Sequence, residues 1–155
     1  MKNLNHVVMG LAPVADAFNG AAVYSDVINM KNWGHIQFLV VRGAAGGAGT
    51  ATITVEACDD TTPSTTVAVP FTYQLNTATD VYAAHAEASA SGVLFTAGAN
   101  LILKVDVDVE ALLASGYSYI RLKSSEVGDF TYVGCILAIL TEGRVEEDIP
   151  ATAIT

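Results

Sequence analysis

The chain has 155 residues, 52% of them hydrophobic and 15% charged, which fits one ordinary folded domain and excludes a disordered chain. Seven Lys and Arg residues against 16 Asp and Glu residues leave a formal net charge of −9, so neither nucleic acid nor an anionic membrane surface is expected as a partner. A charged fraction well below the usual quarter indicates that part of the surface is covered in the working state, as in a homo-oligomer or an assembly subunit.

Short runs that alternate between apolar and polar residues recur along the chain, and Gly, Pro, Asn or Asp separate them. This pattern is typical of an antiparallel all-β domain. Residues 1–20 are predicted to form an extended N-terminal arm. A first strand is expected within 22–30, and a clearer one follows at 35–41 with Ile36, Phe38 and Val40 on one face.

A glycine-rich run, Gly43–Gly49, connects the strand at 35–41 to a strand at 50–57. The second strand alternates regularly, with Ala51, Ile53, Val55 and Ala57 on its inward face. We predict that the two strands pair as a hairpin. Glycines can also cradle a phosphate, but this run lacks a following helix and a GK[ST] ending, so a connecting loop is the preferred interpretation.

The middle of the chain continues the strand pattern. A strand is predicted at 67–75, where Pro70 restricts it to a sheet edge or a bulge, and shorter strands are expected at 81–88 and 92–96. The clearest half-buried strand covers 101–109. Its inward face carries Leu101, Leu103, Val105, Val107 and Val109.

The last third begins with a short helical turn near 109–115, for which Asp108 is placed as the cap and Gly116 as the left-handed stop. Strands are then predicted at 117–124 and 130–141. The second of these is apolar on both faces, so it is either a central strand or it presents one face to another subunit.

Together these elements predict an antiparallel two-sheet β-sandwich, jelly-roll-like, with one short helical turn and extended terminal arms. The domain boundaries that follow are an N-terminal arm at 1–20, a sandwich domain at 21–141 and an acidic C-terminal tail at 142–155.

No pattern of catalytic residues stands out, so we expect neither an enzyme nor a bound cofactor. Asp106, Asp108 and Glu110 recur at every second position and could face a hard cation, but a solvated strand face followed by a helix cap explains the same residues, so no metal site is expected. Cys58 and Cys135 lack metal-ligand spacing and are expected as reduced thiols.

Several segments resemble a family of small virion structural proteins of tailed bacteriophages. They are Tyr24–His35 (YSDVINMKNWGH), Thr52–Asp60 (TITVEACDD), Val69–Tyr73 (VPFTY) and Gly116–Lys123 (GYSYIRLK), within a resemblance that covers residues 20–145. The resemblance implies a capsid decoration or cement protein, a dimer or trimer that binds the major capsid protein on the outside of the shell and stabilises contacts between capsomers. Its location would be the virion exterior, after synthesis in the host cytoplasm.

On this interpretation, apolar residues of the two arms anchor the protein to neighbouring subunits or to the shell. The expected partner-interface residues are Val7, Val8, Leu11, Val14, Phe18, Trp33, Ile149 and Ile154. Two alternatives remain open: a tail or head–tail joining protein, and a β-sandwich module that binds carbohydrate through its aromatic residues or Ca²⁺ through its acidic ones.

Overall fold

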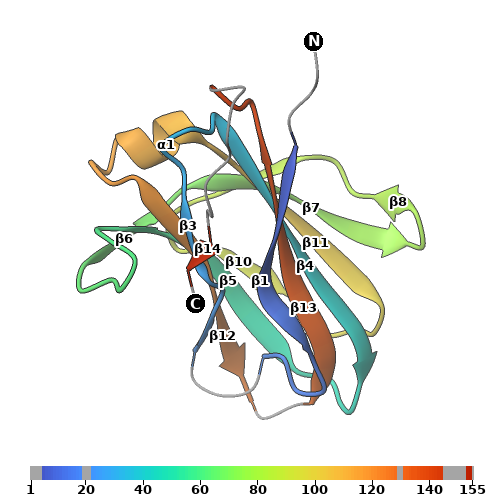
Figure 1. Ribbon diagram of the computed structural model, residues 1–155. Coiled ribbons are helices and arrows are strands. Elements are labelled where there is room, and N and C mark those ends of the chain that lie inside the picture. The colour runs from blue at the N-terminus through green and yellow to red at the C-terminus, as the bar shows by residue number, and fades with distance from the viewer. Residues whose placement is uncertain (1–4, 19–21, 129–130, 145–152, 155) are drawn as a thin grey trace.

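The computed structural model describes residues 5–18, 22–128, 131–144 and 153–154. Within these residues the strands form two antiparallel sheets of seven strands each, which pack face to face (Figure 1). The predicted two-sheet antiparallel sandwich is confirmed.

Both sheets draw their strands from the whole length of the chain. Sheet A has the order β1 (His6–Val14), β13 (Tyr132–Thr141), β4 (His35–Ala45), β11 (Leu101–Asp108), β7 (Phe71–Ala78) and β8 (Val81–Tyr82), and β9 (Ala86–Ala88) also pairs with β7. Sheet B has the order β10 (Val93–Phe95), β5 (Thr50–Cys58), β12 (Tyr119–Val127), β3 (Val27–Asn29) and β14 (Ala153–Ile154), with β2 (Val23–Tyr24) on β12 and β6 (Thr66–Val69) on β5.

The core lies between the two sheets, where the alternating apolar side chains meet. In β11, Leu103, Val105 and Val107 are at most 2% exposed, as the two-residue period predicts. The helix α1 (Val109–Leu113) follows directly, and Gly116 ends it with a φ of 81°. Asp108 occupies the N-cap position as predicted but makes no side-chain capping hydrogen bond.

The predicted hairpin between 35–41 and 50–57 is wrong, because β4 and β5 lie in different sheets. The glycine-rich run crosses from one sheet to the other, and the Tyr132 hydroxyl donates a hydrogen bond to the carbonyl of Gly49 at 2.6 Å. Alternation determines which side chains point inward, but it does not determine which strand lies beside which.

The single strand predicted at 67–75 is two strands. β6 ends at Val69 in sheet B, and β7 begins at Phe71 in sheet A. Pro70 lies between them and has no N–H to donate to a ladder, so both ladders can stop at this residue. The side chains on either side of Pro70 enter the same core, since Val69 is 3% exposed and Phe71 is 5% exposed.

Part of the predicted N-terminal arm is a strand of the sandwich. β1 pairs with β13 from His6 opposite Leu140 to Val14 opposite Gly134, and the backbone N–H of Ala17 donates to the carbonyl of Tyr132. These apolar residues complete the edge of sheet A. At the other end of the chain, β14 pairs with β3, whereas residues 145–152 of the predicted acidic tail lie outside the described residues.

Candidate functional site

The outer face of sheet A carries apolar side chains where a solvent-facing sheet usually carries polar ones. In β13 the inward residues Ile136, Ala138 and Leu140 are fully buried, yet the residues between them are apolar as well. We call the outward set on three neighbouring strands and the start of β11 the apolar face. It consists of Val7, Met9, Leu39, Val41, Ile102, Val133, Cys135, Leu137 and Ile139.

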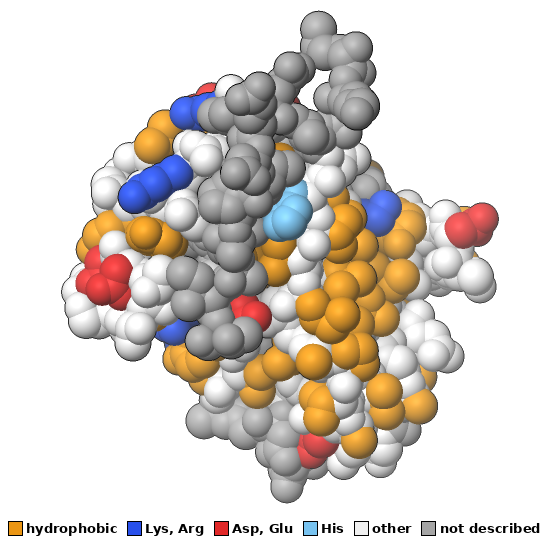
Figure 2. Space-filling model, viewed as in Figure 1, with side chains coloured by type: hydrophobic (Ala, Val, Ile, Leu, Met, Phe, Trp, Pro, Cys, Tyr) orange, Lys and Arg blue, Asp and Glu red, His pale blue; other side chains and the backbone are white. Residues whose placement is uncertain are grey.

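The strand register makes this face continuous. Met9 lies opposite Leu137, which lies opposite Leu39. Figure 2 shows the result as a patch of hydrophobic side chains over β1, β13 and β4. The β1 residues are the most open, since Val7 is 61% exposed and Met9 is 51% exposed. A contiguous apolar patch of this kind marks an interaction surface more often than an isolated exposed residue does.

A polar group borders the apolar face where β4 and β11 pair. Gln37 donates a hydrogen bond from Nε2 to Oδ1 of Asp106 at 2.8 Å, and His35 Nε2 lies 3.4 Å from the same oxygen. On its other side, His35 Nδ1 lies 3.1 Å from the Thr141 hydroxyl. This group holds three strands in register at the polar margin of the face.

The two ionisable groups of this border shift each other's pKa. The hydrogen bond with Asp106 raises the pKa of His35, against the lowering effect of burial. Burial acts to raise the pKa of Asp106, but the hydrogen bonds from His35 and Gln37 outweigh it and hold that pKa below the usual 3.8. Both shifts favour the charged pair.

Five of the eight expected interface residues separate into two groups. Val7 lies on the apolar face, and Val14 is 47% exposed at the end of β1. In contrast, Val8, Phe18 and Trp33 are 8%, 1% and 2% exposed and belong to this chain's own core. Their apolar character, taken as a sign of partner contact, reflects packing between the sheets.

The remaining expected interface residues lie elsewhere. Leu11 follows a register shift in β1 and packs against the core. Ile154 lies in β14, opposite Val27 of β3. Ile149 lies outside the described residues.

Sequence reasoning missed most of the apolar face, although its signal was present. The run 130–141 was recognised as apolar on both faces, which identifies Leu137 and Ile139. In 35–41 the alternation identifies only the inward residues, whereas Leu39 and Val41 form a second apolar face of the same strand.

Sequence reasoning also missed Arg42, which is 1% exposed. Its guanidinium carbon lies 4.1 Å from the ring centre of Phe95 and 4.0 Å from that of Tyr132. Nη1 donates a hydrogen bond to the carbonyl of Thr96 at 2.8 Å. Burial lowers the pKa of Arg42. The stacking between two rings joins the end of β4 to sheet B, which is a structural role.

The part of the chain that the structure describes contains no group of three or more His, Cys, Asp or Glu side chains arranged to hold a metal ion. Asp106 and Asp108 share one face of β11, but Asp106 is held by His35 and Gln37. Cys58 is buried, and burial raises the pKa of its thiol to about 11. None of the helices in the described ranges has the length and hydropathy of a membrane span.

The fold is similar to the crystal structure of the SPBc2 prophage-derived protein YomS, with a TM-score of 0.51 and 14% sequence identity. The similarity covers 92% of this chain and 96% of that chain. At this level of identity it shows a shared fold. No protein-family model matches the chain, and the curated proteins contain no match to it.

Proposed function

We propose that this protein is a structural protein of a bacteriophage virion, and specifically a capsid decoration protein that binds the outer surface of the shell through its apolar face. The apolar face is the observation that carries this proposal. The sequence resemblance to small virion proteins supports the virion role, and the fold shared with a prophage-derived protein supports a phage protein in general.

The physical basis of binding is the removal of apolar surface from water. Leu39, Leu137 and Ile139 lie close together on paired strands, so one partner surface can cover all three, and their backbone is already ordered by the sheet. The polar border at Gln37 and Asp106 provides a polar rim along one side of such a contact.

Shell stabilisation follows from mass action. A protein that binds only the assembled shell lowers the free energy of that state, and an oligomer that contacts several capsomers at once gains from effective concentration. The proposed partner is the major capsid protein, and the proposed oligomer is a dimer or trimer.

The test is the number and position of copies in purified particles of the virus that encodes this chain. The variant Leu39→Gln/Leu137→Gln makes the centre of the apolar face polar. The matched control, Leu94→Gln/Leu113→Gln, makes the same change at side chains that are 52% and 57% exposed elsewhere. Quantitative mass spectrometry against the major capsid protein measures occupancy, and cryo-electron microscopy gives the position.

We expect wild-type copies over the shell exterior, a loss of about tenfold or more in the apolar-face variant, and no loss in the control. Equal occupancy of all three proteins would contradict the role of this face. A few copies at one vertex or along the tail would replace decoration with the joining role. Absence from particles, together with glycan or Ca²⁺ binding by the isolated protein, would replace the virion role altogether.

A further inference from the structure

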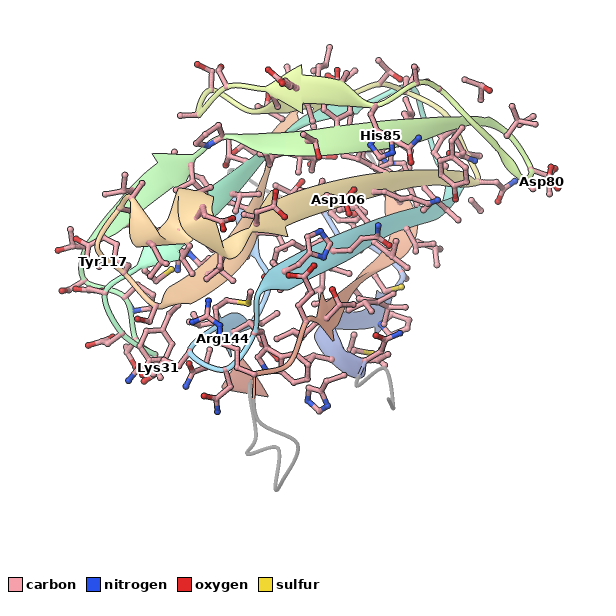
Figure 3. All side chains as sticks on the ribbon, turned by 90° about the horizontal axis from the view of Figure 1, so that it is seen from above. Lys31, Asp80, His85, Asp106, Tyr117 and Arg144 are labelled. Atoms are coloured by element: carbon pink, nitrogen blue, oxygen red, sulfur yellow. The ribbon has the colours of Figure 1, made fainter. Side chains whose placement is uncertain are left out.

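Sheet A opens into a cleft where β7 and β11 separate. The two strands pair from Leu103 opposite Leu75 to Asp106 opposite Thr72. Beyond Asp106, β11 stays with β4 as far as Asp108 and continues into α1, whereas β7 begins at Phe71 and pairs on its other side with β9. Figure 3 shows β11, which carries the labelled Asp106, beside β7, with α1 at the end of β11.

The cleft has a volume of about 600 Å³, which is within the usual range of ligand-binding cavities. Its apolar lining includes side chains of the core itself, since Phe71, Ala88 and Val107 are 5%, 6% and 2% exposed. Pro70 and Ala111 extend this lining toward solvent. The floor therefore suits an aliphatic chain.

The rim of the cleft is acidic. Glu87, Asp106, Asp108 and Glu110 line it, and no Lys or Arg is among the lining residues. Within the described part of the chain, Glu87, Asp108 and Glu110 have no cation in ion-pair range. Oδ2 of Asp106 is buried and accepts no hydrogen bond from the described residues, although Oδ1 is bound by Gln37.

An apolar floor below an acidic rim matches one kind of side chain. Lysine and arginine combine a long aliphatic stem with a cationic end, and they bury the stem along apolar surface while the charge stays at the edge. The stem would lie along Pro70 and Ala111, the accessible part of the apolar lining. The charge would meet Asp108 and Glu110. Because the cleft opens where two strands part, an extended backbone can approach it.

We propose that this cleft binds a lysine or arginine side chain presented by an extended segment of the partner protein. The identity of that partner as the shell protein rests on the proposed function, but the cleft is testable on the isolated full chain. A failure of either proposal can therefore be distinguished from a failure of the other.

The probe is the peptide acetyl-Ala-Leu-Lys-Leu-Ala-amide, titrated into ¹⁵N-labelled protein while amide chemical shifts are followed by NMR. Peptides with Glu or norleucine in place of Lys test the charge, and spermidine tests whether a free polyamine binds as well. The variant Asp108→Asn/Glu110→Gln removes two rim charges. Both side chains are exposed, and Asp108 makes no capping bond, so the fold does not depend on them.

The matched control is Asp60→Asn/Asp80→Asn, which removes the same charge from two exposed loop positions outside the cleft. We expect saturable shifts at residues 71, 72, 87–89 and 106–111, with a Kd of about 1 mM or below for the Lys peptide. The rim variant should weaken binding about threefold to tenfold, and the control should leave it unchanged.

Four results would overturn the proposal. They are the absence of saturable shifts, shifts spread over the whole acidic surface, equal weakening by the two double variants, and binding of spermidine or the norleucine peptide as tight as that of the Lys peptide. Retained cleft binding in a protein that is missing from particles would instead locate the failure in the proposed function.

Discussion

The two sheets share one core but have opposite outer faces. On sheet B the outward residues of β5 and β12 are polar and satisfy one another, since Arg121 Nη2 lies 2.7 Å and Lys123 Nζ lies 3.5 Å from the carboxylate of Glu56. The Tyr24 ring also lies 4.0 Å from the Arg121 guanidinium carbon. On sheet A the corresponding positions of β13 and β4 are Leu137 and Leu39.

This difference distinguishes the apolar faces that the core of the sandwich requires from an apolar face that it does not require. A sandwich needs one apolar face per sheet, and in sheet B the central strands β5 and β12 meet that need while their outward residues stay polar. Sheet A has a second apolar face that the core does not use. An apolar patch of this kind is typical of an interaction surface, and it is the surface through which the proposed shell contact would form.

The largest expected effect is the difference between two alanine substitutions in β13, one at an inward residue and one at the adjacent outward residue. Ile136→Ala should lower the free energy of unfolding by about 2–5 kcal/mol, because Ile136 is fully buried between the sheets. Leu137→Ala, on the adjacent outward position, should cost less, about 1–2 kcal/mol, because Leu137 is only partly buried. Urea denaturation of both variants measures the difference. Equal losses would mean that the apolar face is part of this chain's own core.

A smaller effect is expected on the outer face of sheet B. Glu56→Gln should lower the free energy of unfolding by about 1–2 kcal/mol, because the Glu56 side chain is 10% exposed and neutralises two cations. The exposed Glu87→Gln serves as the control, with an expected change within about 0.5 kcal/mol. Equal losses in the two variants would show that the ion pairs of Glu56 do not stabilise the outer face of sheet B.

The smallest effect concerns the polar border of the apolar face, and it depends on pH. The pKa of His35 is raised above 6.5, so its contribution to stability is complete below pH 6.5 and is lost as the pH rises through the folded-state pKa. The pKa of Asp106 is lowered below 3.8, so its contribution is complete above pH 3.8 and is lost as the pH falls through its folded-state value.

The His35–Asp106 pair is therefore strongest between these two limits. The stability difference between wild type and His35→Gln should be less than about 1 kcal/mol at pH 6 and should shrink toward pH 8. Thermal or urea unfolding at several pH values checks this trend. A difference that grows as the pH rises would show that the imidazole is favoured in its neutral form.

The sequence predicts correctly those features that depend on residues close together in the chain. The faces of 101–109, the helical turn after it and the glycine stop at Gly116 follow from side-chain period and backbone conformation alone. It failed at the hairpin and at Pro70, because the choice of neighbouring strand depends on residues distant in the chain.

The candidate site shows the same limit. Phe18 and Leu137 are both apolar residues that avoid water, and the sequence pattern alone does not tell whether this chain or another one covers them. In the folded chain, Phe18 is buried in the core after β1 has ended, whereas Val7 within β1 is 61% exposed. The burial of Arg42 between two rings has no local signal either.

The most direct test of the apolar face as the shell-binding surface uses Cys135, which is partly exposed on that face. Cys58 is buried with a thiol pKa of about 11, so iodoacetamide should modify it slowly and leave Cys135 as the reporter. Mass spectrometry gives the alkylation rate of Cys135 in the isolated protein and in purified particles. We predict a rate at least about tenfold lower on particles; equal rates in the two states would contradict the account.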